Sequence, residues 1–147
     1  MSASSAGPAF RTLLVPVDGS PLSDKAVAAA IEFARPLHAK IIAVSVAEPY
    51  PDCLEPVTED FDAKTMANAR GRVMRAEQAI RQAGLDCDGV AVRSFEPHQE
   101  IVETAARLRC DAIFMGIHGG NPVGSFFFGS QAQKVLAHST VPVMLLR

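Results

Sequence analysis

The sequence lacks long uninterrupted apolar runs and has no block of basic residues. Although 48% of its 147 residues are hydrophobic, no stretch approaches the roughly 18 consecutive apolar residues that a membrane-spanning helix needs. The formal charge is −2, and no cluster of lysine and arginine is available to neutralise a nucleic-acid backbone. The composition therefore argues against a membrane protein and against a DNA- or RNA-binding protein.

Cysteine is also scarce, and its spacing fits neither a metal site nor a disulfide framework. Cys53, Cys87 and Cys110 are odd in number, far apart and without CxxC spacing. Residues 1–10, MSASSAGPAF, have neither a basic start nor an apolar core, so they indicate a disordered tail rather than a signal peptide. We expect a soluble cytoplasmic protein with one domain over residues 11–147, because this length suits a single core.

Short apolar segments alternate with amphipathic ones along the rest of the chain. Apolar runs of strand length predict buried parallel strands at 11–17, 40–47, 88–94, 112–115 and 141–146. Apolar residues at three- and four-residue steps predict helices that begin at Pro21, about Asp60, Pro97 and Ser130. Pro36 should end the first helix near Arg35, and Gly84 should end the second. This alternation predicts an α/β protein whose parallel sheet binds ligands where the strand order reverses.

A glycine-rich stretch between the fourth predicted strand and the last helix carries the clearest chemical signal. Residues 115–134 read MGIHGGNPVGSFFFGSQAQK. Glycine lacks the Cβ that holds a backbone away from a ligand, so such a loop can turn several N–H groups toward one anion. Gly129 and Ser130 stand at the start of the following helix, where free amides and the positive end of the helix dipole attract phosphate. The stretch therefore predicts phosphate binding.

The glycine spacing excludes two common phosphate motifs and fits a third. No lysine follows the glycines as a P-loop requires, and their spacing does not fit the dinucleotide fingerprint. The nucleotide-binding signature of the universal stress protein family matches without a gap at Gly116, Gly119, Gly129 and Ser130. Other segments are also similar to that family, namely VPVDGS, EPHQEI and the closing KVLAHSTVPVMLL. From Arg11 onward the chain resembles a universal stress protein.

The resemblance implies a fold and a site. The fold is a single doubly wound, mostly parallel five-stranded sheet of order 3-2-1-4-5, with helices on both faces, similar to the adenine-nucleotide alpha-hydrolases. The reversal then falls between the first and fourth strands and brings Asp18 opposite Gly116. The ligand-contacting residues implied by the resemblance are Pro16, Val17, Asp18, Val46, Met115, Gly116, His118, Gly119, Gly129, Ser130 and the backbone amide of Gln131. Structural alternatives stay open, since Asp18 also suits a turn and Val46 also suits core packing.

The resemblance further implies a homodimeric regulatory protein of the stress response that binds ATP, or ADP or AMP in its place. Mg²⁺ is left open as a companion ion, and no catalytic residue or metal ligand is assigned. The dimer contact is expected at the C-terminal strand Val141–Leu146, and a regulatory protein partner remains unidentified. The alternatives are a slow ATPase or phosphoryl-transfer enzyme at the same site and a nucleotide-free dimeric interaction module. Residues 120–125 contain no arginine or lysine, which weakens the case for hydrolysis and leaves phosphate charge to backbone amides.

Overall fold

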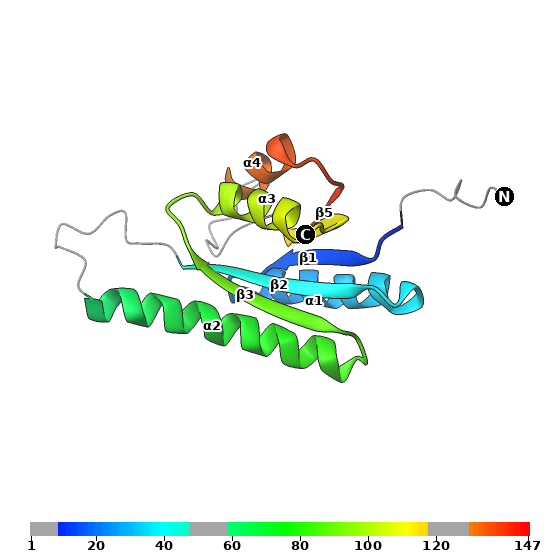
Figure 1. The fold of residues 1–147 in the computed structure, drawn as a ribbon, viewed down its shortest axis with the longest axis horizontal. Coiled ribbons are helices and arrows are strands. Elements are labelled where there is room, and N and C mark those ends of the chain that lie inside the picture. Colours follow the sequence, from blue (N-terminus) through cyan, green and yellow to red (C-terminus); the bar gives the residue numbers. More distant parts are fainter. Residues whose placement is uncertain (1–8, 48–58, 118–129) are drawn as a thin grey trace.

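The computed structural model describes residues 9–47, 59–117 and 130–147. Within these ranges the chain forms a five-stranded sheet of order β3-β2-β1-β4-β5, in which every pairing is parallel (Figure 1). The strands are β1 (Thr12–Pro16), β2 (Lys40–Ala47), β3 (Cys87–Arg93), β4 (Ala112–Gly116) and β5 (Val143–Leu146). The predicted fold class and strand order are confirmed.

Helices cover both faces of the sheet. They are α1 (Pro21–Ala34), α2 (Glu59–Gln82), α3 (Pro97–Arg107) and α4 (Ser130–His138). Helices α1 and α2 lie on one face and α3 and α4 on the other (Figure 1). Neighbouring residues of a strand point to opposite faces, so Leu13 packs with α1 and α2 while Leu14 packs with α3 and α4, both fully buried. No helix in the described ranges is long and apolar enough to cross a membrane.

The ends of α1 and α2 follow the predicted signals. Ser20 caps α1, because its Oγ accepts a hydrogen bond from the Ser23 N–H at 3.1 Å. Helix α1 ends at Ala34, and Pro36 lies in the short 3-10 helix η2 (Arg35–Leu37). Gly84 follows the end of α2 with φ +83°, a left-handed conformation that glycine adopts without strain. Both predicted helix ends are confirmed.

The described chain begins close to the predicted start of the domain. Residues 1–8, most of the predicted tail, lie outside the described residues. Phe10, also assigned to the tail, packs edge-on against Phe33 of α1 with ring centroids 5.3 Å apart. The packed domain therefore starts at least one residue before Arg11.

Two buried cysteines make the stability of the fold depend on pH. Burial raises the pKa of the Cys87 and Cys110 thiols from the ordinary value of 9.0 to about 11. Between these two values the unfolded chain releases the thiol protons and the folded chain keeps them, so stability falls as the pH rises from about 9 to about 11. Urea denaturation at pH 8 and pH 11 should show a larger loss for the natural chain than for a Cys87→Ala/Cys110→Ala variant. Equal losses in the two proteins would contradict this prediction.

Candidate functional site

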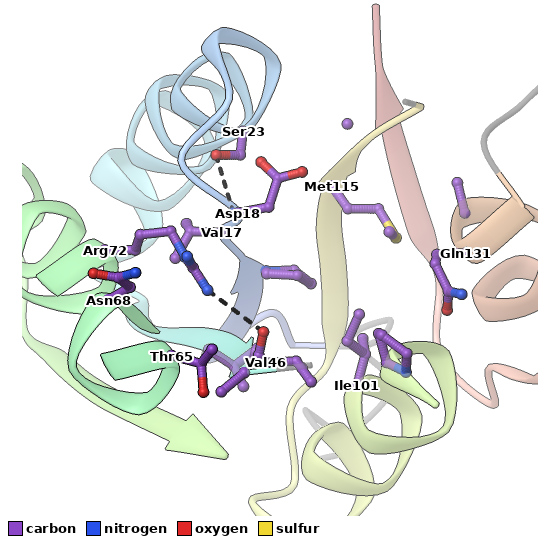
Figure 2. A pocket seen from close by; sticks show the side chains of 16 residues that line it. Val17, Asp18, Ser23, Val46, Thr65, Asn68, Arg72, Ile101, Met115 and Gln131 are labelled. Atoms are coloured by element: carbon purple, nitrogen blue, oxygen red, sulfur yellow. Dashed lines mark hydrogen bonds between the residues drawn. The ribbon is translucent and has the colours of Figure 1, made fainter. Parts of the chain in front are cut away.

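A cavity of about 400 Å³ lies where the strand order reverses between β1 and β4. Its volume falls within the roughly 300–1,000 Å³ typical of small-molecule sites. The carboxyl ends of β1, β2 and β4 form its floor, and α2, α3 and α4 contribute its walls (Figure 2). This is the edge at which parallel α/β sheets bind ligands.

Most of the predicted site residues lie around this cavity. Those that line it are Pro16, Val17, Asp18, Val46, Met115, Gly116 and Gln131. Asp18 and Gly116, far apart in the sequence, are thus brought to one site as expected. Ser130 is the exposed first residue of α4, next to Gln131. The remaining predicted residues lie outside the described residues, namely His118, Gly119 and Gly129.

Asp18 serves the turn between β1 and α1 and also lines the cavity. One carboxylate oxygen, Oδ1, accepts a hydrogen bond from the Ser20 N–H at 2.9 Å. The Asp18 N–H donates to Ser23 Oγ at 3.4 Å. The carboxylate is exposed and stands at the mouth of the cavity (Figure 2). The turn role and the ligand role, treated as alternatives from sequence, are therefore compatible.

Apolar side chains form the part of the cavity that suits a flat aromatic group. Val46 is the penultimate residue of β2 and Met115 that of β4, and Ile101 of α3 packs in the same core cluster as Met115. Ile101 and Met115 are 4% and 7% exposed, so the core holds both in place. A mostly apolar pocket with a few polar groups at its rim is the usual design of a small-molecule site.

The α2 wall brings polar side chains that the sequence analysis did not assign to the site. Thr65, Asn68 and Arg72 line the cavity, facing Met115 and Gln131 across it (Figure 2). They are spaced three and four residues apart, which places them on one face of the helix. This row of polar residues is the pattern in the sequence that could have identified them as site residues. Arg72 corrects the expectation of a site without a basic side chain, since α2 places a guanidinium in the lining of the cavity.

Arg72 is tied directly to the end of β2 and, through Ser45, to the residue that follows β1. Its Nε donates to Ser45 Oγ at 2.8 Å, and its Nη2 donates to the Val46 carbonyl at 3.4 Å. Ser45 Oγ in turn donates to the Val17 carbonyl at 2.7 Å. Ser45 is only 1% exposed. A chain of hydrogen bonds that passes through the buried Ser45 thus connects α2 through β2 to the residue that precedes Asp18.

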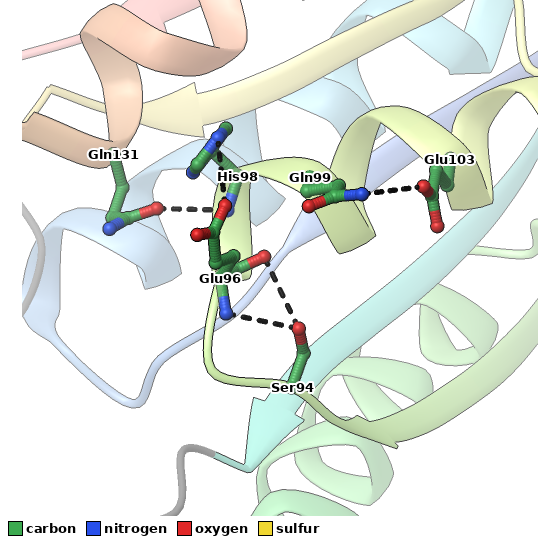
Figure 3. A network of polar contacts seen from close by, with 6 residues as sticks. All are labelled: Ser94, Glu96, His98, Gln99, Glu103 and Gln131. Atoms are coloured by element: carbon green, nitrogen blue, oxygen red, sulfur yellow. Dashed lines mark hydrogen bonds and ion pairs between the residues drawn. The ribbon is translucent and has the colours of Figure 1, made fainter. Parts of the chain in front are cut away.

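Gln131 joins the start of α4 to the start of α3. Glu96, the residue before α3, forms no side-chain cap; instead Gln131 Oε1 accepts a hydrogen bond from the His98 N–H at 2.8 Å (Figure 3). The His98 ring also packs against His138 at the end of α4, with centroids 5.9 Å apart. The Gln131 side chain therefore has a structural task, and its backbone N–H, in the first turn of α4, is the group it can offer a ligand.

Comparisons with known proteins agree with this architecture. Residues 9–147 match the model of the Universal stress protein family. The "Universal stress protein in QAH/OAS sulfhydrylase 3′region" of Thermus aquaticus is 35% identical over 139 residues, which cover 94% of this chain and 99% of that protein.

Solved structures share the fold at lower sequence identity. A universal stress protein from Archaeoglobus fulgidus in complex with dAMP is 21% identical with a TM-score of 0.70, covering 95% of this chain and 100% of that chain. A universal stress protein in complex with cAMP is 24% identical with a TM-score of 0.71, covering 94% and 97% of the two chains. The match over residues 9–147 and the Thermus aquaticus relative show that this chain belongs to the universal stress protein family.

Proposed function

We propose that this protein is a cytoplasmic regulatory protein of the stress response that binds an adenine nucleotide, ATP or its products ADP and AMP, between β1 and β4. The observation that carries this proposal is the convergence of Asp18, Val46, Met115 and Gln131 on one cavity at the strand reversal. Two universal stress proteins of the same fold have been solved with dAMP and with cAMP, which supports adenine nucleotides as the ligand class.

Each part of the nucleotide has a matching surface. The base would pack between Val46 and Met115, and a ribose hydroxyl would donate to the Asp18 carboxylate. The phosphates would approach the first turn of α4, where the amides of Ser130 and Gln131 lie at the positive end of the helix. Gly119 and Gly129 would complete the phosphate contacts, and Mg²⁺, when it accompanies ATP, would bind phosphate oxygens.

The same proposal includes a homodimer formed through Val141–Leu146. Strand β5 is at the edge of the sheet, where backbone N–H and C=O groups remain available for another chain. Met144, in the middle of this strand, is 46% exposed although it is a large apolar side chain. A second copy would cover both features, and a regulatory partner would recognise the nucleotide-bound dimer.

Nucleotide binding is expected to raise the melting temperature. Micromolar affinity corresponds to about −8 kcal/mol, and ligand at 100 times Kd adds about 2.7 kcal/mol of stability. For a domain of this size each kcal/mol raises Tm by about 2–4 °C, so ATP should raise it by roughly 5–10 °C. Thermal shift and calorimetry with ATP, ADP and AMP measure this, and phosphate release on the same samples separates binding from hydrolysis.

A pair of variants controls this measurement. Val46→Trp places a large ring where the base would lie, so it should abolish the shift. Asp24→Asn removes an exposed charge on α1 away from the cavity lining, so it should leave the shift unchanged. Absence of nucleotide binding to the natural, folded dimer would overturn the proposed function.

A further inference from the structure

Arg72 is linked to the chain on both sides of Asp18, through Ser45 to Val17 and directly to Gly19. On one side, its Nε donates to Ser45 Oγ at 2.8 Å, and Ser45 Oγ donates to the carbonyl of Val17 at 2.7 Å. On the other side, its aliphatic stem lies against Gly19, where a Cβ would be 3.1 Å from Arg72 Cδ. The residues immediately before and after Asp18 therefore both depend on a side chain from α2.

The geometry of this connection is rigid. Ser45 is buried within β2, where a hydroxyl must be hydrogen-bonded and has little freedom to rotate to other partners. The guanidinium plane is oriented by the bond from Nε to Ser45 and by the bond from Nη2 to the Val46 carbonyl. Val17 is further held by its own N–H, which donates to the Val44 carbonyl at 2.8 Å. A shift of Arg72 would thus displace the turn that carries Asp18.

We propose that Arg72 is a positioning residue of the nucleotide site, acting through Ser45 and Gly19 to present the Asp18 carboxylate in one orientation. This inference rests on the proposed function. It adds that Arg72 holds the turn that carries Asp18 in the conformation that binds the ligand. Because Asp18 would meet the ribose or base, the contribution of Arg72 to affinity is the same for charged and uncharged ligands. A direct contact between Arg72 and phosphate would instead grow with ligand charge.

The binding test compares adenosine, AMP and ATP by calorimetry on Arg72→Lys, Ser45→Ala and the double variant. Lysine keeps the charge but lacks the planar fork that bonds Ser45 and Val46 of β2 at once. Each single variant breaks the bond between Arg72 and Ser45, so each should weaken the binding of all three ligands about fivefold, the size of effect that loss of one hydrogen bond produces. The double variant should bind the ligands no more weakly than either single variant, because both changes interrupt the same path from Arg72 through Ser45 to Val17. Arg70→Lys, an exposed position on α2 that does not line the cavity, is the matched control and should change nothing.

Two binding results would overturn the inference. One is an unchanged affinity in Ser45→Ala or in Arg72→Lys. The other is a loss that is absent for adenosine and increases from AMP to ATP, because that pattern assigns Arg72 to the phosphates.

A ligand-free measurement separates this inference from the proposed function. The Ser20 N–H donates to Asp18 Oδ1 at 2.9 Å, so its hydrogen exchange reports on the orientation of the carboxylate. In the free protein, Ser45→Ala and Arg72→Lys should each speed exchange of this amide several-fold, while the Ile113 amide, bonded to the Pro142 carbonyl, should not change. Unchanged exchange at Ser20 would overturn the positioning role. If the natural protein binds no nucleotide, the proposed function fails and the Ser20 amide still decides the positioning role.

Discussion

A Gly89→Val variant is expected to lose about 1–3 kcal/mol of unfolding free energy, or more, because β3 and α2 meet at this residue without room for a side chain. A Cβ on Gly89 would lie 2.1 Å from Glu77 Oε1 and 2.2 Å from Val73 Cγ1. The Glu77 carboxylate can swing aside, whereas Val73 is β-branched and 4% exposed, so it cannot. The helix must therefore move, and the neighbouring Arg72 would be pulled away from Ser45.

Gly71→Ala is the matched control on the same helix. Gly71 is exposed, and nothing lies within 4 Å of a Cβ built on it. Alanine there should stabilise the protein by about 0.4–1 kcal/mol, because it restricts the unfolded chain and favours the helix. Urea denaturation should thus give a lower unfolding free energy for Gly89→Val and a higher one for Gly71→Ala than for the natural chain. A Gly89→Val variant that unfolds like the natural chain would show that α2 does not approach β3 so closely.

The elements of the fold could be predicted because their signals are local. Leu13 and Leu14 are both buried, one toward each layer of helices, and only a strand covered on both faces needs such a continuous apolar run. Pro36 and Gly84 end their helices for backbone reasons that act over a few residues. The strand order, in contrast, came from the family resemblance, since periodicity does not determine which strands pair.

The residues at strand ends could also be predicted as site residues. Parallel strands all finish at the same edge of the sheet, so Asp18 after β1 and Met115 in β4 must approach one another once the two strands are neighbours. This argument needs only the strand boundaries and the order of strands. It does not depend on side-chain conformation.

The α2 wall could not be predicted in the same way. Helical spacing shows that Asn68 and Arg72 share a face, but the rotation and tilt of α2 over the sheet decide whether that face overhangs the strand ends. These are set by distant contacts such as Gly89 with Val73. The bond from Gln131 to the first turn of α3 is equally non-local, so only its backbone role could be foreseen.

Gln131→Glu is expected to keep the fold and weaken ATP binding. Glutamate retains an oxygen that can accept the His98 N–H, now bonded at 2.8 Å. Its charge, at the start of both α3 and α4, should leave stability unchanged or raise it by about 0.3–1 kcal/mol. The same carboxylate about 8 Å from a phosphate would cost about 2 kcal/mol at an effective dielectric constant of about 20, or roughly 30-fold in affinity. Calorimetry should show less loss for AMP, none for adenosine, and a smaller effect at high salt.

Gln131→Ala separates the two roles of this residue. It removes the acceptor for the His98 N–H, so it should cost about 1 kcal/mol of stability, as loss of a helix cap does. It keeps the backbone amide at the start of α4 and adds no charge, so affinity for ATP should stay within about twofold of the natural value. If Gln131→Glu instead binds ATP as well as the natural chain does, the phosphates do not lie at the start of α4. Equal losses for ATP and adenosine would lead to the same conclusion, because the added charge would then act on the pocket rather than on phosphate.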